Sequence, residues 1–269
     1  MSDQTFQDKI IDTKTGAAIK AIKHFCGQAK PYVAFSGGKD STVVLELVRL
    51  SGVDYDAHYS VTTVDPPEIL KFIRTHYPEV IWERPEKTMW QLIIDNGIPP
   101  TRKMRYCCRL IKEVCGDGRT VITGVRSSES SARRTRQIAE RCFVADTDKL
   151  YINPILEWTT ADVWSFIRKH NLPYCSLYDE GFERIGCVMC PNNRLRVRDV
   201  HRFPKFYKAY LRTFDKMLEV RRGKGLKTTW QSGQDVMDWW LQDDQRYWDA
   251  YIAKNSQLKL DLTQKGGDA

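Results

Sequence analysis

The chain has 269 residues, of which 42% are hydrophobic and 28% are charged, and its formal net charge is +8. This length suits one large α/β domain with an appendage or two modest domains, and the composition excludes a chain that is disordered throughout. No stretch approaches the roughly 18 apolar residues of a membrane span, and residues 1–4 lack the features of a secretory signal, so we expect a cytoplasmic protein with no membrane partner.

Short apolar runs typical of strands alternate with segments whose apolar residues recur at helical spacing. Strands are predicted at 32–35, 55–61, 80–84, 120–123 and 150–155. Helices are predicted at 17–27, 42–48, 67–76, 107–115 and 163–170, and again from Phe203 onward. A threonine cap within 159–160 and an acid at Asp162 open the helix at 163–170. The alternation predicts an α/β fold: a parallel sheet of about five strands with helices on both faces, plus a helical C-terminal region.

Positive charge is concentrated in two blocks. Residues 101–142 hold eleven Lys and Arg against four Asp and Glu, and residues 194–227 hold twelve against three, so the rest of the chain is net acidic. Such blocks suit a polyanion, either nucleotide phosphates or a nucleic acid backbone, although a pair of solvated surfaces is the plain alternative. A single nucleotide rarely needs this much charge, so we expect contact with nucleic acid.

A glycine-rich loop of sequence Ser-Gly-Gly-Lys-Asp-Ser, residues 36–41, joins the first predicted strand to a helix. Gly37 and Gly38 let the backbone turn tightly and approach a ligand, and the N-terminus of the following helix favours an anion. Ser36 and Ser41 add hydroxyl donors, and Lys39 adds a positive charge. The spacing differs from that of the Walker loop. The loop is therefore predicted to bind phosphates at the carboxyl end of a strand.

This hexapeptide resembles the PP-loop of the N-type ATP pyrophosphatases, whose signature is Ser-Gly-Gly-x-Asp-Ser. The resemblance implies a sheet of the adenine-nucleotide alpha-hydrolase-like (HUP) type, a loop that holds the β,γ-pyrophosphate of ATP, and a Mg²⁺ ion. It also implies transfer of AMP to an acceptor with release of pyrophosphate. It assigns nucleotide binding to the whole loop, including Gly37 and Gly38, and catalytic roles to Ser36, Lys39, Asp40 and Ser41.

The eight cysteines are expected in a reducing compartment, where metal binding is a better explanation than disulfides. Cys107 and Cys108 are adjacent, and Cys187 and Cys190 have the spacing that lets two thiolates reach one metal centre. Four soft ligands suit zinc or an iron–sulfur cluster, and free structural thiols are the third alternative. The others are expected to be small buried side chains, with Cys175 as a candidate sulfur carrier: Cys26, Cys115, Cys142 and Cys175.

From about residue 32 to residue 191 the chain resembles the phosphoadenosine-phosphosulfate reductase superfamily. In the iron–sulfur members of that superfamily, segments like those around Cys107–Cys108 and Cys187–Cys190 hold a [4Fe–4S] cluster, so the resemblance implies the same ligands here.

The same resemblance extends to residues near the nucleotide. Gly124 and Arg126 match a second phosphate-contacting segment, and Arg133, Arg134 and Arg136 follow it, either as further contacts or as a solvated basic helix. Residues 62–68, beginning with Thr62, resemble a loop that contacts adenine or ribose, although an acid and a glycine usual in that loop are absent.

Two features separate the chain from the sulfonucleotide reductases: its complete ATP-type loop, and the lack of a cysteine after Cys190, where reductases carry the attacking thiol. The closer resemblance is to the DndC and SspD branch of DNA phosphorothioation. That resemblance implies adenylation of the DNA backbone and insertion of sulfur delivered by a cysteine desulfurase. Assimilatory reduction of a sulfonucleotide, tRNA-type base thiolation and a non-catalytic nucleotide- or DNA-binding module are the alternatives.

We expect four segments along the chain: an N-terminal helical segment at 1–30, the PP-loop domain with its cysteines at 31–192, a helical region at 193–262 and a disordered tail at 263–269. Whether the protein forms a homo-oligomer is left open by the sequence.

Overall fold

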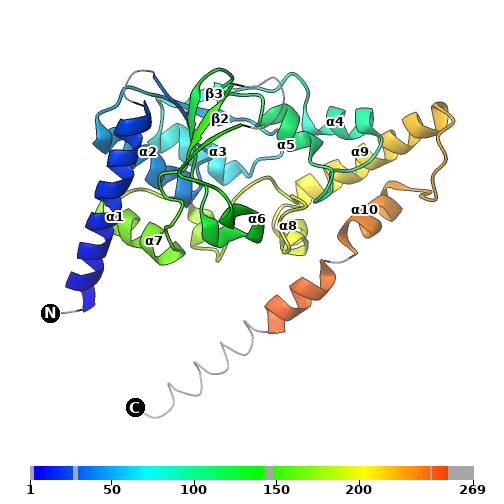
Figure 1. The fold of residues 1–269 in the computed structure, drawn as a ribbon. Helices are drawn as coiled ribbons and strands as arrows, with labels where there is room; N and C mark the ends of the chain where they lie inside the picture. Colours follow the sequence, from blue (N-terminus) through cyan, green and yellow to red (C-terminus); the bar gives the residue numbers. More distant parts are fainter. Residues whose placement is uncertain (1–2, 27–29, 143–147, 243, 254–269) are drawn as a thin grey trace, which may run out of the picture. The chain divides into compact units, whose positions relative to one another are not determined.

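The structure is a computed structural model that describes residues 3–26, 30–142, 148–242 and 244–253 (Figure 1). The predicted tail at 263–269 lies outside the described residues, as do residues 254–262 of the predicted helical region. None of the helices in the described part of the chain is long and apolar enough to cross a membrane.

The chain divides into two compact units, and each is described by itself. The first unit comprises Met1–Val61, Asp65–Pro85 and Ile111–Gly186, and the second comprises Thr62–Val64, Glu86–Leu110 and Cys187–Ala269. The glycine-rich loop therefore belongs to the first unit and the four predicted metal ligands to the second. The four-segment division expected from the sequence stays a prediction.

A six-stranded sheet with the order β3-β2-β1-β4-β6-β5 forms the centre of the first unit. Its strands are β1 (Tyr32–Ala34), β2 (Asp56–Ser60), β3 (Ile81–Glu83), β4 (Thr120–Ile122), β5 (Ala139–Arg141) and β6 (Leu150–Ile152). Every pairing is parallel except that of β5 with β6. The predicted α/β fold is confirmed, with one strand more than the five expected. The additional strand, β5, is an edge strand whose side chains are half-buried or exposed, so it carries no apolar pattern.

The middle of the sheet positions the candidate site. Val33 of β1 pairs with Ala57 of β2 on one side and Ile122 of β4 on the other, and Val33 and Ile122 are fully buried. The chain runs from β1 to β2 and β3 on one side of the sheet and then to β4, β5 and β6 on the other side, where β6 lies between β4 and β5. The strand order thus reverses between β1 and β4, and the crevice at the carboxyl ends of such strands is where open α/β sheets bind ligands.

The helices of the first unit are α1 (Asp3–Cys26), α2 (Lys39–Ser51), α3 (Pro67–His76), α6 (Ser131–Arg134) and α7 (Thr160–Lys169). Helices α1, α2 and α7 pack against one another, as Figure 1 shows. The predicted helix at 42–48 begins earlier, at Lys39, so half of the glycine-rich loop forms the first turn of α2. The predicted threonine cap of α7 is confirmed, because Thr159 accepts a hydrogen bond from the backbone N–H of Asp162.

The second unit is helical. It contains α4 (Met89–Asn96), α5 (Tyr106–Ile111), α8 (Arg196–Arg202), α9 (Pro204–Gly223) and α10 (Gly233–Leu241), and residues 245–253 are also helical. Helix α9 packs against α4, α8 and α10 and contributes the buried side chains of Tyr210, Phe214 and Met217. The predicted helix at 107–115 is shorter than expected, because turns follow Ile111 and lead to Gly116 at a φ of 73°.

Candidate functional site

The loop at residues 36–41 is held in shape mainly by its own residues. The backbone N–H of Ser36 donates to Ser41 Oγ at 3.1 Å, and Ser41 Oγ donates to the carbonyl of Gly38 at 2.9 Å. Gly37 has a φ of +71°, and a Cβ there would lie 3.0 Å from the side chain of Ile73. Both conditions favour glycine, because any other residue here would be strained and would push the Ile73 side chain aside.

The N-terminus of α2 faces this loop. Gly38 is its N-cap residue and supplies no side chain to cap the helix. The N–H groups of a first turn need acceptors, and the helix dipole favours a negative one. Ser36 is exposed, whereas Lys39 and Ser41 are 4% and 5% exposed, so Ser36 offers its hydroxyl at the surface of the loop.

Arg126, which follows β4, reaches the loop. Its Nε donates to Asp40 Oδ1 at 2.6 Å, and its Nη1 lies 3.3 Å from both the carbonyl of Trp158 and Thr160 Oγ1. The other Asp40 oxygen lies 3.2 Å from Lys39 Nζ. Arg126 is only 3% exposed, and a buried guanidinium is tolerated when an anion compensates it. The structure therefore brings together Asp40 and Arg126, two predicted site residues from distant parts of the chain.

Gly124 lies against the backbone of the same loop. A Cβ at this position would be 3.1 Å from the carbonyl carbon of Asp40 and 3.2 Å from the backbone nitrogen of Ser41. The end of β4 therefore touches the first turn of α2, and any side chain at Gly124 would push the two apart. This packing alone accounts for a glycine at position 124, and no contact with a ligand is needed to explain it.

The predicted roles of two further nucleotide-binding residues rest on the sequence alone. Arg133 lies on α6, where it pairs with Glu129 one turn earlier. Thr62 is 1% exposed and belongs to the second unit. The nucleotide-binding roles of Arg133 and Thr62 stay predictions.

Sequence reasoning missed a tyrosine at the phosphate loop. The backbone N–H of Lys39 donates to Tyr178 Oη at 2.8 Å, while Lys39 Nζ donates to the carbonyl of Glu183 at 3.1 Å and lies 5.5 Å from the centre of the Tyr178 ring. Burial raises the pKa of Tyr178 well above its ordinary value, so the hydroxyl stays protonated. No motif marks this segment in the sequence, because the contact arises where the chain returns after α7.

The Cys187 and Cys190 pair lies in a tight turn of the second unit. The backbone N–H of Cys190 donates to the carbonyl of Cys187 at 3.2 Å, and Met189 has a φ of 59°. The carboxylate of Asp199 accepts from the backbone N–H of Met189 at 2.9 Å, and burial raises the pKa of Asp199 to about 6. Asp199 therefore fixes a turn that places two cysteines close together.

The Cys107 and Cys108 pair begins α5 in the same unit, and all four cysteines are half-buried. The pKa of Cys107 is raised by its hydrogen bond with Cys108, then by burial, and then by the nearby charges of Cys187 and Cys190. Arg102 Nε donates to the carbonyl of Pro191 at 2.8 Å and so links the two segments.

The four thiols suit a soft metal centre by their chemistry and by their gathering in one unit. Within the described ranges, however, no group of three or more His, Cys, Asp or Glu side chains has a geometry that could hold a metal ion. The cluster therefore stays a proposal.

The remaining cysteines divide into two classes. Cys26 and Cys175 are buried as expected, and burial raises the pKa of both, that of Cys26 to about 11. A protonated, buried thiol is a poor nucleophile, which disfavours Cys175 as a sulfur carrier. Cys115 and Cys142 are half-exposed, so the expectation that they are buried side chains was wrong.

Comparison with known proteins agrees with the superfamily resemblance seen in the sequence. Two uncharacterized proteins of Methanocaldococcus jannaschii are 33% and 31% identical over 75% of this chain, and the chain spans about half their length, 45% and 52%. The adenosine 5'-phosphosulfate reductase of Staphylococcus haemolyticus is 26% identical over 58% of this chain and 68% of that protein. The structure of phosphoadenylyl-sulfate reductase from Candida auris in a phosphate complex is 18% identical, with a TM-score of 0.49 over 70% of this chain and 96% of that one. The family description "Phosphoadenosine phosphosulfate reductase domain" matches residues 30–193, more than half of the chain, and the chain belongs to this family.

Proposed function

We propose that this protein is an ATP pyrophosphatase that adenylates an acceptor during sulfur transfer, and that the acceptor is the phosphate backbone of DNA. The observation that carries the proposal is the complete loop from Ser36 to Ser41, placed where the strand order reverses, with Arg126 paired to Asp40 beside it. A loop of this kind offers a helix N-terminus, hydroxyl donors and two cations to a polyphosphate.

In the proposed reaction, an acceptor oxygen attacks the α-phosphorus of ATP, and the bond to the β-phosphate breaks as pyrophosphate leaves. Negative charge grows on the leaving group, where Lys39 and Arg126 would stabilise it. Ser36 and Ser41 would donate to phosphate oxygens. Asp40 would hold Mg²⁺, since this hard cation prefers carboxylate and phosphate oxygens, and the ion would supply positive charge that stabilises the leaving pyrophosphate.

Sulfur chemistry is proposed for the second unit. Cys107, Cys108, Cys187 and Cys190 would hold a [4Fe–4S] cluster, which would relay sulfur or electrons when bound. A cysteine desulfurase is the proposed sulfur donor. The protein contributes the half-buried position of the thiols, the turn fixed by Asp199, and the link from Arg102 to Pro191.

A surface of the second unit supports the nucleic acid partner. We call it the arginine–aromatic face, and it consists of Arg194, Arg198, His201, Arg246, Tyr247, Trp248 and Tyr251. The guanidinium of Arg194 lies 5.2 Å from the centre of the Tyr247 ring, and the Trp248 and Tyr251 rings stack at 5.6 Å. Arginines interleaved with aromatic rings are typical of surfaces that contact phosphates and stack bases.

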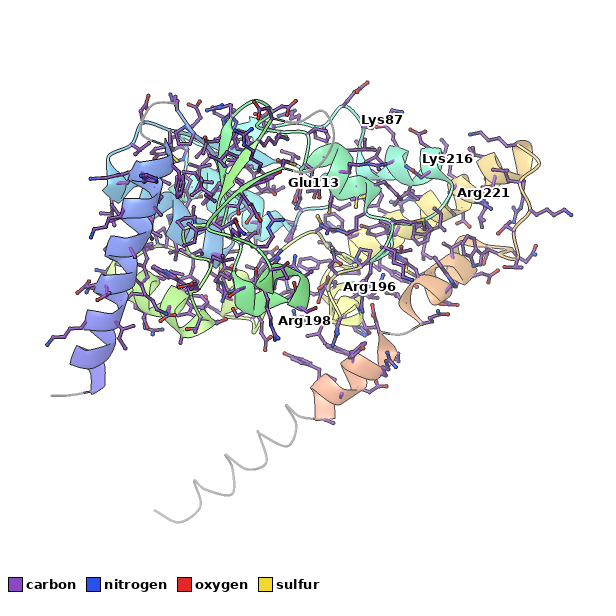
Figure 2. The ribbon with its side chains drawn as sticks, in the orientation of Figure 1. Lys87, Glu113, Arg196, Arg198, Lys216 and Arg221 are labelled. Carbon is purple, nitrogen blue, oxygen red and sulfur yellow. The ribbon has the colours of Figure 1, made fainter. Side chains whose placement is uncertain are left out.

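The two arginines labelled on α8 in Figure 2 illustrate how this face is built. Arg196 is buried, pairs with Asp244 and donates to the carbonyl of Trp240, so it joins α8 to the chain around 240–244. Arg198 is half-buried and lies 5.8 Å from the Tyr251 ring centre. One arginine thus stabilises the unit, and the other belongs to the surface that we propose binds nucleic acid.

The main test is release of pyrophosphate from ATP, measured with and without DNA. We expect release that is lost in the variants Ser36→Ala and Asp40→Ala. Absence of release under every condition would contradict the proposal.

Reduction of a sulfonucleotide is the second candidate, and a specific observation favours it. The chain belongs to the phosphoadenosine phosphosulfate reductase domain family, and several of its relatives are adenosine 5'-phosphosulfate reductases. Production of sulfite from adenosine 5'-phosphosulfate in the presence of a thiol reductant, without pyrophosphate release from ATP, would establish this second function instead.

The nucleic acid partner is tested by fluorescence anisotropy with a labelled DNA duplex over a range of salt concentrations. We expect the double variant Arg194→Gln and Arg246→Gln to weaken binding about tenfold and to reduce the salt dependence. The double variant Lys20→Gln and Lys23→Gln, two exposed changes on α1 that remove the same charge, is the matched control and should bind as the parent does. Equal weakening by both variants would show that net charge, and not this face, determines binding.

A further inference from the structure

The first turn of α2 has a hydrogen-bond partner from outside the phosphate loop. Gly38 offers no side chain to cap the helix, and the first helical N–H, that of Lys39, donates to Tyr178 Oη at 2.8 Å. In an anion site at a helix N-terminus, N–H groups of this kind are the ones from which a phosphate oxygen accepts. The tyrosine hydroxyl therefore takes a hydrogen bond that would otherwise be available to a ligand.

The hydroxyl of Tyr178 lies on the same side of the loop as that of Ser36. A Cβ placed on Gly38 would be 3.4 Å from Tyr178 Oη and 3.5 Å from Ser36 Oγ. The two hydroxyl groups therefore flank the same side of a residue that has no side chain of its own. A phosphate group above Gly38 would lie within hydrogen-bonding reach of both.

Tyr178 has a proton to donate. Its oxygen accepts from the N–H of Lys39, and a phenol can accept one hydrogen bond and donate another at the same time. Burial keeps the hydroxyl in its protonated form. The Tyr178 hydroxyl can therefore accept from the N–H of Lys39 and donate its own proton to a ligand that lies further from the helix N-terminus.

The segment around Tyr178 is anchored, so the hydroxyl would remain in place when a ligand arrives. Cys175 and Leu177 on one side and Phe182 on the other are buried, with exposed fractions of 1%, 0% and 7%. The backbone N–H of Phe182 donates to the carbonyl of Leu177 at 3.1 Å, and the rings of Tyr178 and Trp164 form a T-shaped pair with their centres 5.2 Å apart. These contacts fix the backbone on both sides of Tyr178, and a movement of its hydroxyl away from Lys39 would disturb the ring packing on Trp164.

We propose that Tyr178 is a phosphate-binding residue, whose hydroxyl donates to the polyphosphate of a bound nucleotide while it accepts from the N–H of Lys39. This inference rests on the proposed ATP function and names a specificity residue of that same site. Tyr178 also positions the Lys39 side chain, whose ammonium lies over its ring and donates to Glu183. The ligand class is a polyphosphate, because the hydroxyl adds a donor beside Ser36 at the loop that is proposed to hold the phosphates.

The test compares Tyr178→Phe with the parent protein by isothermal titration calorimetry, with inorganic pyrophosphate, ATP and AMP as ligands. A hydrogen bond to a charged group changes affinity by about tenfold or more, so we expect the Kd for pyrophosphate and for ATP to rise about tenfold. The Kd for AMP should change by less than about twofold, because AMP lacks the phosphates that the loop is proposed to hold.

Tyr174→Phe is the matched control. Tyr174 is 41% exposed, and its hydroxyl donates to Asp179 at 3.1 Å. It lies four residues before Tyr178 and has no contact with the loop that the structure records, so the control should bind all three ligands as the parent does. If Tyr178 had only a structural role, Tyr178→Phe would lower the melting temperature and weaken the binding of all three ligands alike.

Several outcomes would overturn the inference. Unchanged pyrophosphate affinity in Tyr178→Phe would show that the hydroxyl does not touch the ligand, and tighter binding would show that it competes with the ligand. Equal weakening of AMP would remove the claimed selectivity for a polyphosphate. If the parent protein bound neither ATP nor pyrophosphate, the proposed function would fail first, and this inference would fail with it.

Discussion

The phosphate loop and the cysteine pairs are built in opposite ways. The loop takes its shape from one hexapeptide, and Gly124 and Arg126 complete it from the end of one neighbouring strand. The four cysteines come from two segments about eighty residues apart, and their placement depends on Asp199, Arg102 and the carbonyl of Val64, which accepts from Val188.

This difference teaches how each site can be recognised and how each can fail. A local motif fixes its own geometry, so its loss follows from changes to its own few residues. A site assembled from distant segments depends on residues that never touch the ligand. The predictions below test whether the two regions differ in this way.

The largest effect is expected for Arg126→Met. This change removes the partner of Asp40 and the contacts to Trp158 and Thr160. Loss of one partner of a buried pair costs about 3 kcal/mol, and loss of a cation from a phosphoryl-transfer site lowers the rate by about 100-fold or more. Urea unfolding and pyrophosphate release measure the two effects.

Arg133→Met is the control for that change. Arg133 pairs with Glu129 at the surface, where a pair contributes about 1 kcal/mol or less. Pyrophosphate release close to that of the parent would show that the pair with Glu129 is the whole role of Arg133. A loss as large as that in Arg126→Met would extend the phosphate site onto α6, as the sequence predicted.

The next effect concerns metal content. In anaerobically purified protein, Cys107→Ser and Cys187→Ser should each lower bound iron and acid-labile sulfide to less than about half of the parent value, because cluster and fold stabilise each other. Cys142→Ser, a half-exposed cysteine of the first unit, is the control and should leave iron unchanged.

Measurement of pyrophosphate affinity in the same cysteine variants tests whether the two regions are independent. If the two regions are independent, the cysteine variants keep the affinity of the parent for pyrophosphate. One zinc per chain in place of iron would contradict the proposed cluster, and a joint loss of iron and pyrophosphate affinity would contradict the contrast between the regions.

A smaller effect is expected for Gly124→Ala, which places a methyl group 3.1 Å from the carbonyl carbon of Asp40. Backbone must move to accept it, at a cost of about 1–2 kcal/mol in the free energy of unfolding, and the displaced loop should bind pyrophosphate about tenfold more weakly. Gly16→Ala in α1, where no described atom beyond the adjacent helix backbone lies within 4 Å of the added methyl, should instead be stabilising by up to about 1 kcal/mol. Equal affinities in the two variants would mean that the loop tolerates displacement from β4.

The same contrast explains what the sequence could predict. Motifs with fixed spacing predicted that the loop follows β1 and that Gly124 and Arg126 belong to the same site. The structure brings these residues together. Arg133 lies close to Arg126 in sequence, but the helical turn directs it toward Glu129. The role of Tyr178 could not be foreseen, since no periodicity or motif encodes which loop will cover a helix N-terminus. Strand β5 was missed because an edge strand with polar residues lacks an apolar pattern.

The last prediction concerns a residue that supports the cysteine turn from ten residues further along the chain. Burial raises the pKa of Asp199 from 3.8 to about 6, so the folded protein binds this proton more tightly than the unfolded chain does. Its contribution to the free energy of unfolding is therefore complete below about pH 4 and is lost as the pH rises through 6, by about 2–3 kcal/mol in total.

Asp199→Asn should remove that loss, because the amide oxygen can still accept from the N–H of Met189 while carrying no charge. Urea unfolding of both proteins at pH 4 and pH 7 measures the difference, and the parent should lose stability relative to the variant at the higher pH. An identical difference at both pH values would mean that Asp199 is ionised throughout and is stabilised by its hydrogen bonds. In that case the turn at Cys187–Cys190 would depend on the charge of Asp199. The predicted outcome makes the turn depend on a neutral acceptor instead. The phosphate loop differs in this respect, because its Asp40 is paired with the cation of Arg126.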